Sequence, residues 1–145
     1  MALTVTLRID GLRETLRAFD RLPDDADTQL RDASQRIADS MAGHIRAAAT
    51  AEGRQAGALA RTVRARRDRV PVVVAGGTSR LGRKRKPAFK LLYGSEFGSH
   101  RLPQFKPHMG SGSYWFFTTV EDREVEMGRE WSAAADRIIR AFGTG

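Results

Sequence analysis

The sequence contains no cysteine, which excludes disulfide bonds and zinc sites built from thiolates. The same absence is compatible with a reducing compartment. No apolar run approaches the roughly 20 residues that a helix needs to cross a bilayer. The N-terminal residues alternate between apolar and polar instead of forming the continuous hydrophobic stretch of a signal segment. We therefore expect a soluble protein that is made in a cytoplasm and has no membrane partner.

Acidic residues are almost absent from one part of the chain. The 145 residues carry a net charge of +8, but residues 54–90 hold 12 Lys or Arg and a single acid, Asp68, which gives this part a charge of +11. The other 13 basic and 16 acidic residues leave the rest of the chain at −3. This asymmetry predicts one polyanionic or acidic partner surface. The length favours one domain over residues 1–145, small for an enzyme with a deep cleft.

The first 22 residues predict a strand and a helix. Apolar and polar residues alternate from Leu3 to Ile9, which is typical of a half-buried strand. Asp10 stands where it could cap a following helix, and Leu12, Leu16 and Phe19 then recur at helical spacing.

A second helix should be much longer. Asp24 and Asp25 suit the positive end of a helix dipole. One apolar face then runs on to Gly53, which supplies a stop, so the helix has about 28 residues and a length of roughly 42 Å. The residues expected on that face are Leu30, Ile37, Met41, Ile45 and Ala48.

The second half of the chain predicts strands and a final helix. Strands are expected at 62–65 and 70–75, and Pro71 suggests an edge position for the latter because proline cannot donate to a ladder. A mobile basic loop should follow around residues 76–90, with further strands at 91–93 and 113–120. The last helix should span residues 121–142, with acids at its start and Val125, Trp131, Ile138 and Phe142 on its inner face. The expected fold class is α+β, a small and mostly antiparallel sheet packed against one long helix and a C-terminal helix.

Two segments look like functional sites, a phosphate-binding loop and a metal site, but both are better interpreted as loops. Residues 77–84 approach a phosphate-binding loop, but Arg83 and Lys84 replace its lysine and hydroxyl, and Pro87 blocks the helix that should follow. The residues Glu96, His100 and His108 could be imagined as metal ligands, but glycine and proline disfavour the helix that would bring them together. His44 is interpreted as a packing or surface residue of the long helix, and no serine or threonine has a convincing base nearby in sequence. We expect no catalytic residue, no metal and no cofactor.

An unusual segment joins the two halves of the chain. It places an aromatic, a lone carboxylate and two glycines within six residues, and a Phe-x-Pro element follows. The residues that form this motif are Tyr93, Glu96, Phe97, Gly98, Ser99, Phe105 and Pro107. Upstream, residues 56–62 read Ala-Gly-Ala-Leu-Ala-Arg-Thr, and residues 3–22 combine a strand, a Gly-Leu pair and an amphipathic helix.

In this order, the motifs resemble the tail-completion or head–tail joining family of long-tailed bacteriophages, whose members build the neck between the capsid portal and the tail tube. The likeness covers nearly the whole chain, although an inserted Gly-Ser-Gly and aromatic segment departs from many members. The resemblance implies a structural protein of the virion, assembled in the host bacterial cytoplasm as a ring, expected to be a hexamer. Its partners would be neighbouring neck and tail proteins (stopper, terminator or tail tube) and the genomic DNA that passes through the lumen. Within the same class, a tail terminator that caps the tail tube is the alternative.

The resemblance also gives roles to three sets of residues. The Glu96–Gly98 turn would form a core or subunit contact. The basic residues Arg80, Arg83, Lys84, Arg85 and Lys86 would meet an acidic partner face or DNA, and we favour the protein partner. In a strand, Tyr114 and Phe116 would lie on one face and Trp115 and Phe117 on the other, one pair entering the core and the other covering a helix or subunit contact. Base stacking by these aromatics beside the basic segment defines the alternative of another class, a small basic nucleic-acid-binding protein.

Overall fold

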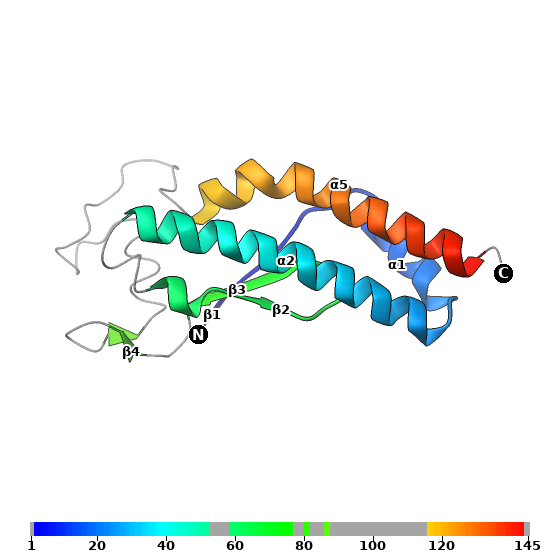
Figure 1. Cartoon of the computed structure of the whole chain (residues 1–145), viewed down its shortest axis with the longest axis horizontal. Helices are drawn as coiled ribbons and strands as arrows, with labels where there is room; N and C mark the ends of the chain where they lie inside the picture. The colour runs from blue at the N-terminus through cyan, green and yellow to red at the C-terminus, as the bar shows by residue number, and fades with distance from the viewer. Residues whose placement is uncertain (1, 53–58, 77–79, 82–85, 88–115, 144–145) are drawn as a thin grey trace.

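The computed structural model describes residues 2–52, 59–76, 80–81, 86–87 and 116–143 (Figure 1). The helices are α1 (Leu12–Asp20), α2 (Asp24–Glu52), the short 3-10 helix η1 (Ala60–Thr62) and α5 (Phe116–Gly143), and the strands are β1 (Ala2–Thr6), β2 (Arg64–Arg66), β3 (Val72–Gly76), β4 (Arg80–Leu81) and β5 (Lys86–Pro87). This arrangement confirms the predicted α+β class, with one long helix and a C-terminal helix beside a small antiparallel sheet.

The three-stranded sheet has the order β1-β3-β2, and both pairs are antiparallel. Both strands predicted between residues 62 and 75 are present with shifted bounds, but β3 is central, so its predicted edge position is wrong. Pro71 lies one residue before the first residue of β3, where its missing N–H leaves the ladder inside the strand intact. The β1 ladder ends at the pair Thr6 and Val72, because the next partner on β3's side is that proline.

The helix α2 has 29 residues and confirms the predicted scaffold. Its first turn contains Asp24, Asp25 and Asp27, whose charges suit the positive end of the helix dipole. Four of the five expected face residues are buried (Leu30, Ile37, Met41 and Ile45), while Ala48 is half-buried against the same core.

The cap of α1 differs from the prediction. The N-cap residue is Gly11, not Asp10, and no side chain caps the helix. Gly11 has φ 72°, a left-handed conformation that glycine adopts without the steric penalty of a Cβ. Its carbonyl accepts hydrogen bonds from Thr15, through the amide at 3.1 Å and through the hydroxyl at 3.0 Å.

The helix α5 begins earlier than predicted. Residues 116–120 belong to its first turns, so the strand predicted at 113–120 is wrong in that part, and residues 113–115 lie outside the described part of the chain. No acid lies in its first turn, because Glu121 and Asp122 come later. A short aromatic run suits a strand or a buried helix equally, and here the helical spacing of Val120, Met127, Trp131 and Ile138 decides.

One residue of the predicted inner face of α5 points outward. Val125 is 66% exposed, whereas Trp131 and Ile138 are buried and Phe142 packs partly against the core. Val125 is six residues before Trp131, which on an α-helix places the two side chains about 120° apart, so they cannot share a narrow inner face.

The predicted loop at 76–90 contains a short hairpin in its described part. Arg80 pairs with Pro87 and Leu81 pairs with Lys86 across β4 and β5. The predicted flexible basic loop at residues 76–90 thus contains a two-residue ladder that pairs the backbones of these four residues. Residues 77–79 and 82–85 lie outside the description, as do Gly53 and the predicted strand at 91–93.

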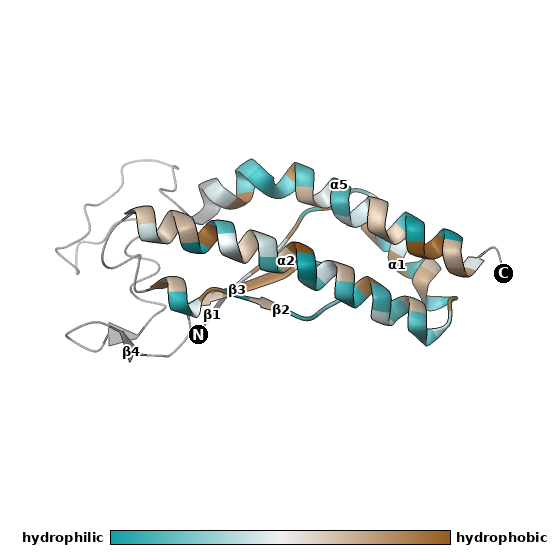
Figure 2. Ribbon diagram, in the orientation of Figure 1, coloured by the Kyte–Doolittle hydropathy of each residue, from teal (hydrophilic) through white to brown (hydrophobic). Residues whose placement is uncertain are grey.

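The core forms where α2 packs on both of its sides. In Figure 1, α2 lies between α5 and the strands β2 and β3, and it contacts all three. Hydrophobic and hydrophilic residues alternate along both long helices (Figure 2), as expected for amphipathic helices that keep part of their surface exposed. At the other side of α5, Glu124 Oε1 accepts a hydrogen bond of 2.8 Å from the Arg8 amide, which ties α5 to the connection between β1 and α1.

No helix of the described residues is both long and apolar enough for a membrane span.

We predict that Ile37→Asp prevents folding. Ile37 is 7% exposed in the core, and an unpaired carboxylate there exceeds the few kcal/mol that such a chain can lose. Ser40→Asp, one turn further along α2 on its exposed face, is the matched control and should leave the melting temperature nearly unchanged. A soluble Ile37→Asp protein with the wild-type melting temperature would remove Ile37 from the core.

Candidate functional site

Most sequence-predicted site residues lie outside the described part of the chain. This holds for the motif residues Tyr93, Glu96, Phe97, Gly98, Ser99, Phe105 and Pro107, for Arg83, Lys84 and Arg85, for Tyr114 and Trp115, and for His100 and His108. Their predicted roles remain predictions.

The described members of these sets are four. Arg80 lies in β4 and Lys86 in β5, so the hairpin brings two of the basic residues onto neighbouring strands. Phe116 and Phe117 belong to the first turn of α5. The strand predicted for these two residues is therefore wrong, because both belong to a helix.

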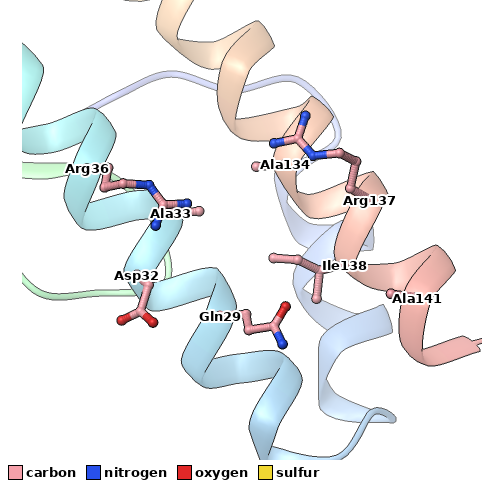
Figure 3. A pocket seen from close by; sticks show the side chains of 8 residues that line it. All are labelled: Gln29, Asp32, Ala33, Arg36, Ala134, Arg137, Ile138 and Ala141. Carbon is pink, nitrogen blue, oxygen red and sulfur yellow. The ribbon is translucent and has the colours of Figure 1, made fainter.

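A groove that the sequence did not indicate lies between α2 and α5 (Figure 3). It consists of two pockets of about 320 and 310 Å³, which share Ala33 and Arg36 of α2 and Ala134 and Arg137 of α5. We call these four residues the arginine groove. The alanines leave room for the groove between the two helices, because neither side chain extends beyond Cβ.

The two pockets are lined by two arginines and two acids, Asp32 and Glu130, which do not pair with those arginines. In Figure 3, the side chains of Arg36 and Arg137 extend from facing helices toward the gap between them. Neither forms an ion pair or hydrogen bond with a described residue. Asp32, one turn before Arg36, points away from α5 and forms an ion pair of 2.7 Å with Arg67. Glu130 lines the second pocket but lies beyond ion-pair distance of both arginines.

Arg69 shows how a structural arginine in this protein differs from the two in the groove. Its guanidinium lies 3.1 Å from Asp20 and 2.9 Å from Asp27, and it donates a hydrogen bond of 2.9 Å to the Leu16 carbonyl. The contact between Arg69 and Asp27 is an ion pair and not a hydrogen bond. The Asp27 carboxylate lies close to Nε of Arg69, but Nε has no hydrogen-bond acceptor among the described residues. These contacts hold the turn between β2 and β3 against α1 and α2.

The arginine groove offers positive charge and hydrogen-bond donors. Guanidinium groups donate hydrogen bonds in a planar fork that matches carboxylate and phosphate groups.

Among the described residues, no cluster of three or more His, Cys, Asp or Glu could hold a metal ion. His44 is half-buried on α2. There was little indication of the arginine groove in the sequence. Arg36 and Arg137 can be recognised as neighbours only once the packing of α2 against α5 brings them to one groove.

Comparison of the chain with protein families, with curated proteins and with solved structures found no match in any of the three.

We predict different effects of two arginine replacements on stability. Arg137→Gln should change the free energy of unfolding by no more than about 0.5 kcal/mol, because it removes no contact within the described residues. Arg69→Gln should lower it by about 1–3 kcal/mol, because Asp20 and the Leu16 carbonyl lose their partner and Asp27 keeps only Arg31. Urea unfolding of both variants measures the difference. Equal losses would show that Arg137 is structural and not part of a binding site.

Proposed function

We propose that the protein is a structural subunit of a bacteriophage head–tail connector. It assembles as a ring, expected to be six-fold, around the channel for the genomic DNA and completes the tail or joins it to the head. In this proposal it acts in the virion and catalyses no reaction.

The observation that supports this proposal most is the set of contacts that the motif at residues 59–62 makes in the fold. The family resemblance includes a Leu-x-x-Ser/Thr element, which here is Leu59 to Thr62. Leu59 is fully buried in the core. The Thr62 hydroxyl donates to the Leu59 carbonyl at 2.7 Å and accepts from the Gly76 amide at 3.0 Å. The two characteristic positions thus join η1 to the end of β3. These contacts explain why the motif needs a leucine and a hydroxyl three residues later.

The other motifs of the resemblance follow these two residues along the chain. Thr62 holds the last residue of β3, and the sequence then runs through the basic segment and the Tyr93–Pro107 motif before α5 begins at Phe116. In the proposed ring, the basic segment meets an acidic face of a neighbouring neck or tail protein. The Glu96–Gly98 turn lies at a core or subunit contact. A tail terminator would use the same parts in the adjacent layer.

A specific observation also favours the alternative of another class. Arg61 of η1 and Arg64 of β2 are exposed, and their side chains form no ion pair or hydrogen bond with a described residue. Arginines on a short exposed edge could contact phosphates. A small basic nucleic-acid-binding protein therefore stays the second candidate.

Native mass spectrometry and negative-stain electron microscopy of the purified chain test the proposal. We expect closed rings with an open lumen and weak retention of DNA. Gly98→Val should reduce ring formation, because a β-branched residue is strongly disfavoured wherever φ is positive. Gly43→Ala, in α2 with no neighbouring atom within 4 Å of the added Cβ, is the control that should assemble normally.

The same preparation distinguishes the two candidates. A chain that stays monomeric and binds DNA tightly, with affinity that falls roughly a thousandfold between about 50 and about 200 mM salt, would support nucleic-acid binding and contradict the ring.

A further inference from the structure

The outward side of α5 carries a regular pattern of charged residues. The buried side of the helix contains Val120, Met127, Trp131, Ala135 and Ile138. On the opposite side lie seven exposed residues, which we call the outer stripe: Glu126, Arg129, Glu130, Ala133, Asp136, Arg137 and Arg140. At 100° per residue, Glu126, Ala133 and Arg140 form its middle line. The pair Glu130 and Arg137 lies along one edge, and Arg129 and Asp136 lie along the other.

The charges of the outer stripe are complementary to those of a second copy that runs in the opposite direction. Glu126 lies seven residues before Ala133, and Arg140 lies seven after it. Along one edge, Glu130 precedes Ala133 by three residues and Arg137 follows it by four. Along the other edge the signs are exchanged, with Arg129 before the centre and Asp136 after it. Every charge on one side of Ala133 has an opposite charge at nearly the same distance on the other side.

This pattern fits two antiparallel helices related by a two-fold axis. Such an axis places residues of the same edge opposite each other, at equal distances from the centre. It therefore brings Glu130 of each copy to Arg137 of the other, and Arg129 to Asp136. A parallel arrangement would instead place Glu126 against Glu126 and Arg140 against Arg140. Ala133 at the centre lets the helices approach closely, since interaxial distance depends on side-chain size at the contact.

We propose that two copies of the chain associate through their outer stripes in this antiparallel arrangement. The proposal does not depend on the neck function. A two-fold contact is complete with two copies, whereas a cyclic ring uses a head-to-tail contact between different surfaces.

Two further observations support a second copy as the occupant. Glu126, Arg129, Glu130, Asp136 and Arg137 form no ion pair or hydrogen bond with a described residue, so their charges are available. The stripe contains three acids and three arginines and is neutral, although the chain carries +8. Two copies can therefore meet at this face without the net repulsion that opposes contact elsewhere.

The arginine groove borders the stripe along one edge. Arg137 belongs to both, and Glu130 lines the second pocket of the groove. The carboxylate of Glu130 from the second copy would come opposite Arg137, and Arg36 adds a second positive charge in the same groove. The anion that the groove binds is thus a carboxylate of another copy.

Charge reversal tests the pairing directly. Sedimentation equilibrium of the purified chain at about 50 mM salt should show a monomer–dimer step, weakened at about 500 mM salt because screening shortens the range of charge interactions. Glu130→Arg and Arg137→Glu should each raise the dissociation constant by at least about tenfold, because each places like charges opposite each other.

An equimolar mixture of these two variants should associate again. In the antiparallel pair, the arginine introduced on one copy meets the glutamate introduced on the other, and the unchanged Arg137 of the first variant meets the unchanged Glu130 of the second. Glu121→Arg, an exposed position of α5 outside the stripe, is the matched control and should associate as the wild type does.

A cross-link provides a second test that ring formation does not disturb. The chain has no cysteine, so Ala133→Cys introduces a single thiol at the centre of the stripe. Antiparallel pairing brings two such residues together, and oxidation should give a disulfide-linked dimer on a non-reducing gel. Ala47→Cys, exposed on α2, should remain largely monomeric under the same conditions.

Three results would overturn the proposal. These are a wild-type chain that stays monomeric at every concentration tested, charge-reversal variants that associate like the wild type, and a mixture of the two variants that stays dissociated.

Discussion

A buried group of hydrogen bonds holds the three main parts of the described fold together. Ser34 of α2 is fully buried, and its hydroxyl donates to the Arg69 carbonyl at 2.7 Å. The indole N–H of Trp131 in α5 lies 2.9 Å from the Ser34 hydroxyl and 3.0 Å from the same carbonyl. Two helices and the turn between β2 and β3, up to 97 residues apart in sequence, thus meet at one point. An unpaired polar group there would carry the full cost of desolvation, so these contacts fix the position of α5.

The surfaces proposed to bind depend on that position. Trp131 fixes the rotation of α5, which turns Arg137 toward Arg36 and leaves Ala133 at the centre of the outer face. A rotation by one residue, about 100°, would carry the outer stripe out of line and move charged residues into the core. The interior therefore sets where the surfaces proposed to bind lie on the molecule. The Leu59 and Thr62 contacts serve the sheet in the same way at the other end of α2.

The elements with a long and regular pattern were predictable from the sequence, and those decided by tertiary contacts were not. The length of α2 and its buried face followed from helical periodicity over many residues. Pro71 is misleading because a proline next to a strand and a proline inside an edge strand look alike in sequence. Residues 116–120 suggest a strand although they form a helix, because a short aromatic run carries no usable period. The arginine groove could not be found from the sequence, since Arg36 and Arg137 lie 101 positions apart and meet only through helix packing.

A double-mutant cycle on Ser34 and Trp131 tests the central claim most directly. Urea unfolding of Ser34→Ala, Trp131→Phe and the double variant gives the coupling free energy between the two side chains. If both act through one buried hydrogen-bonded group at the Arg69 carbonyl, the two losses should not add, and the coupling should be about 1 kcal/mol. Losses that add to within about 0.3 kcal/mol would contradict the account, because they would show that α2 and α5 are held together by packing alone.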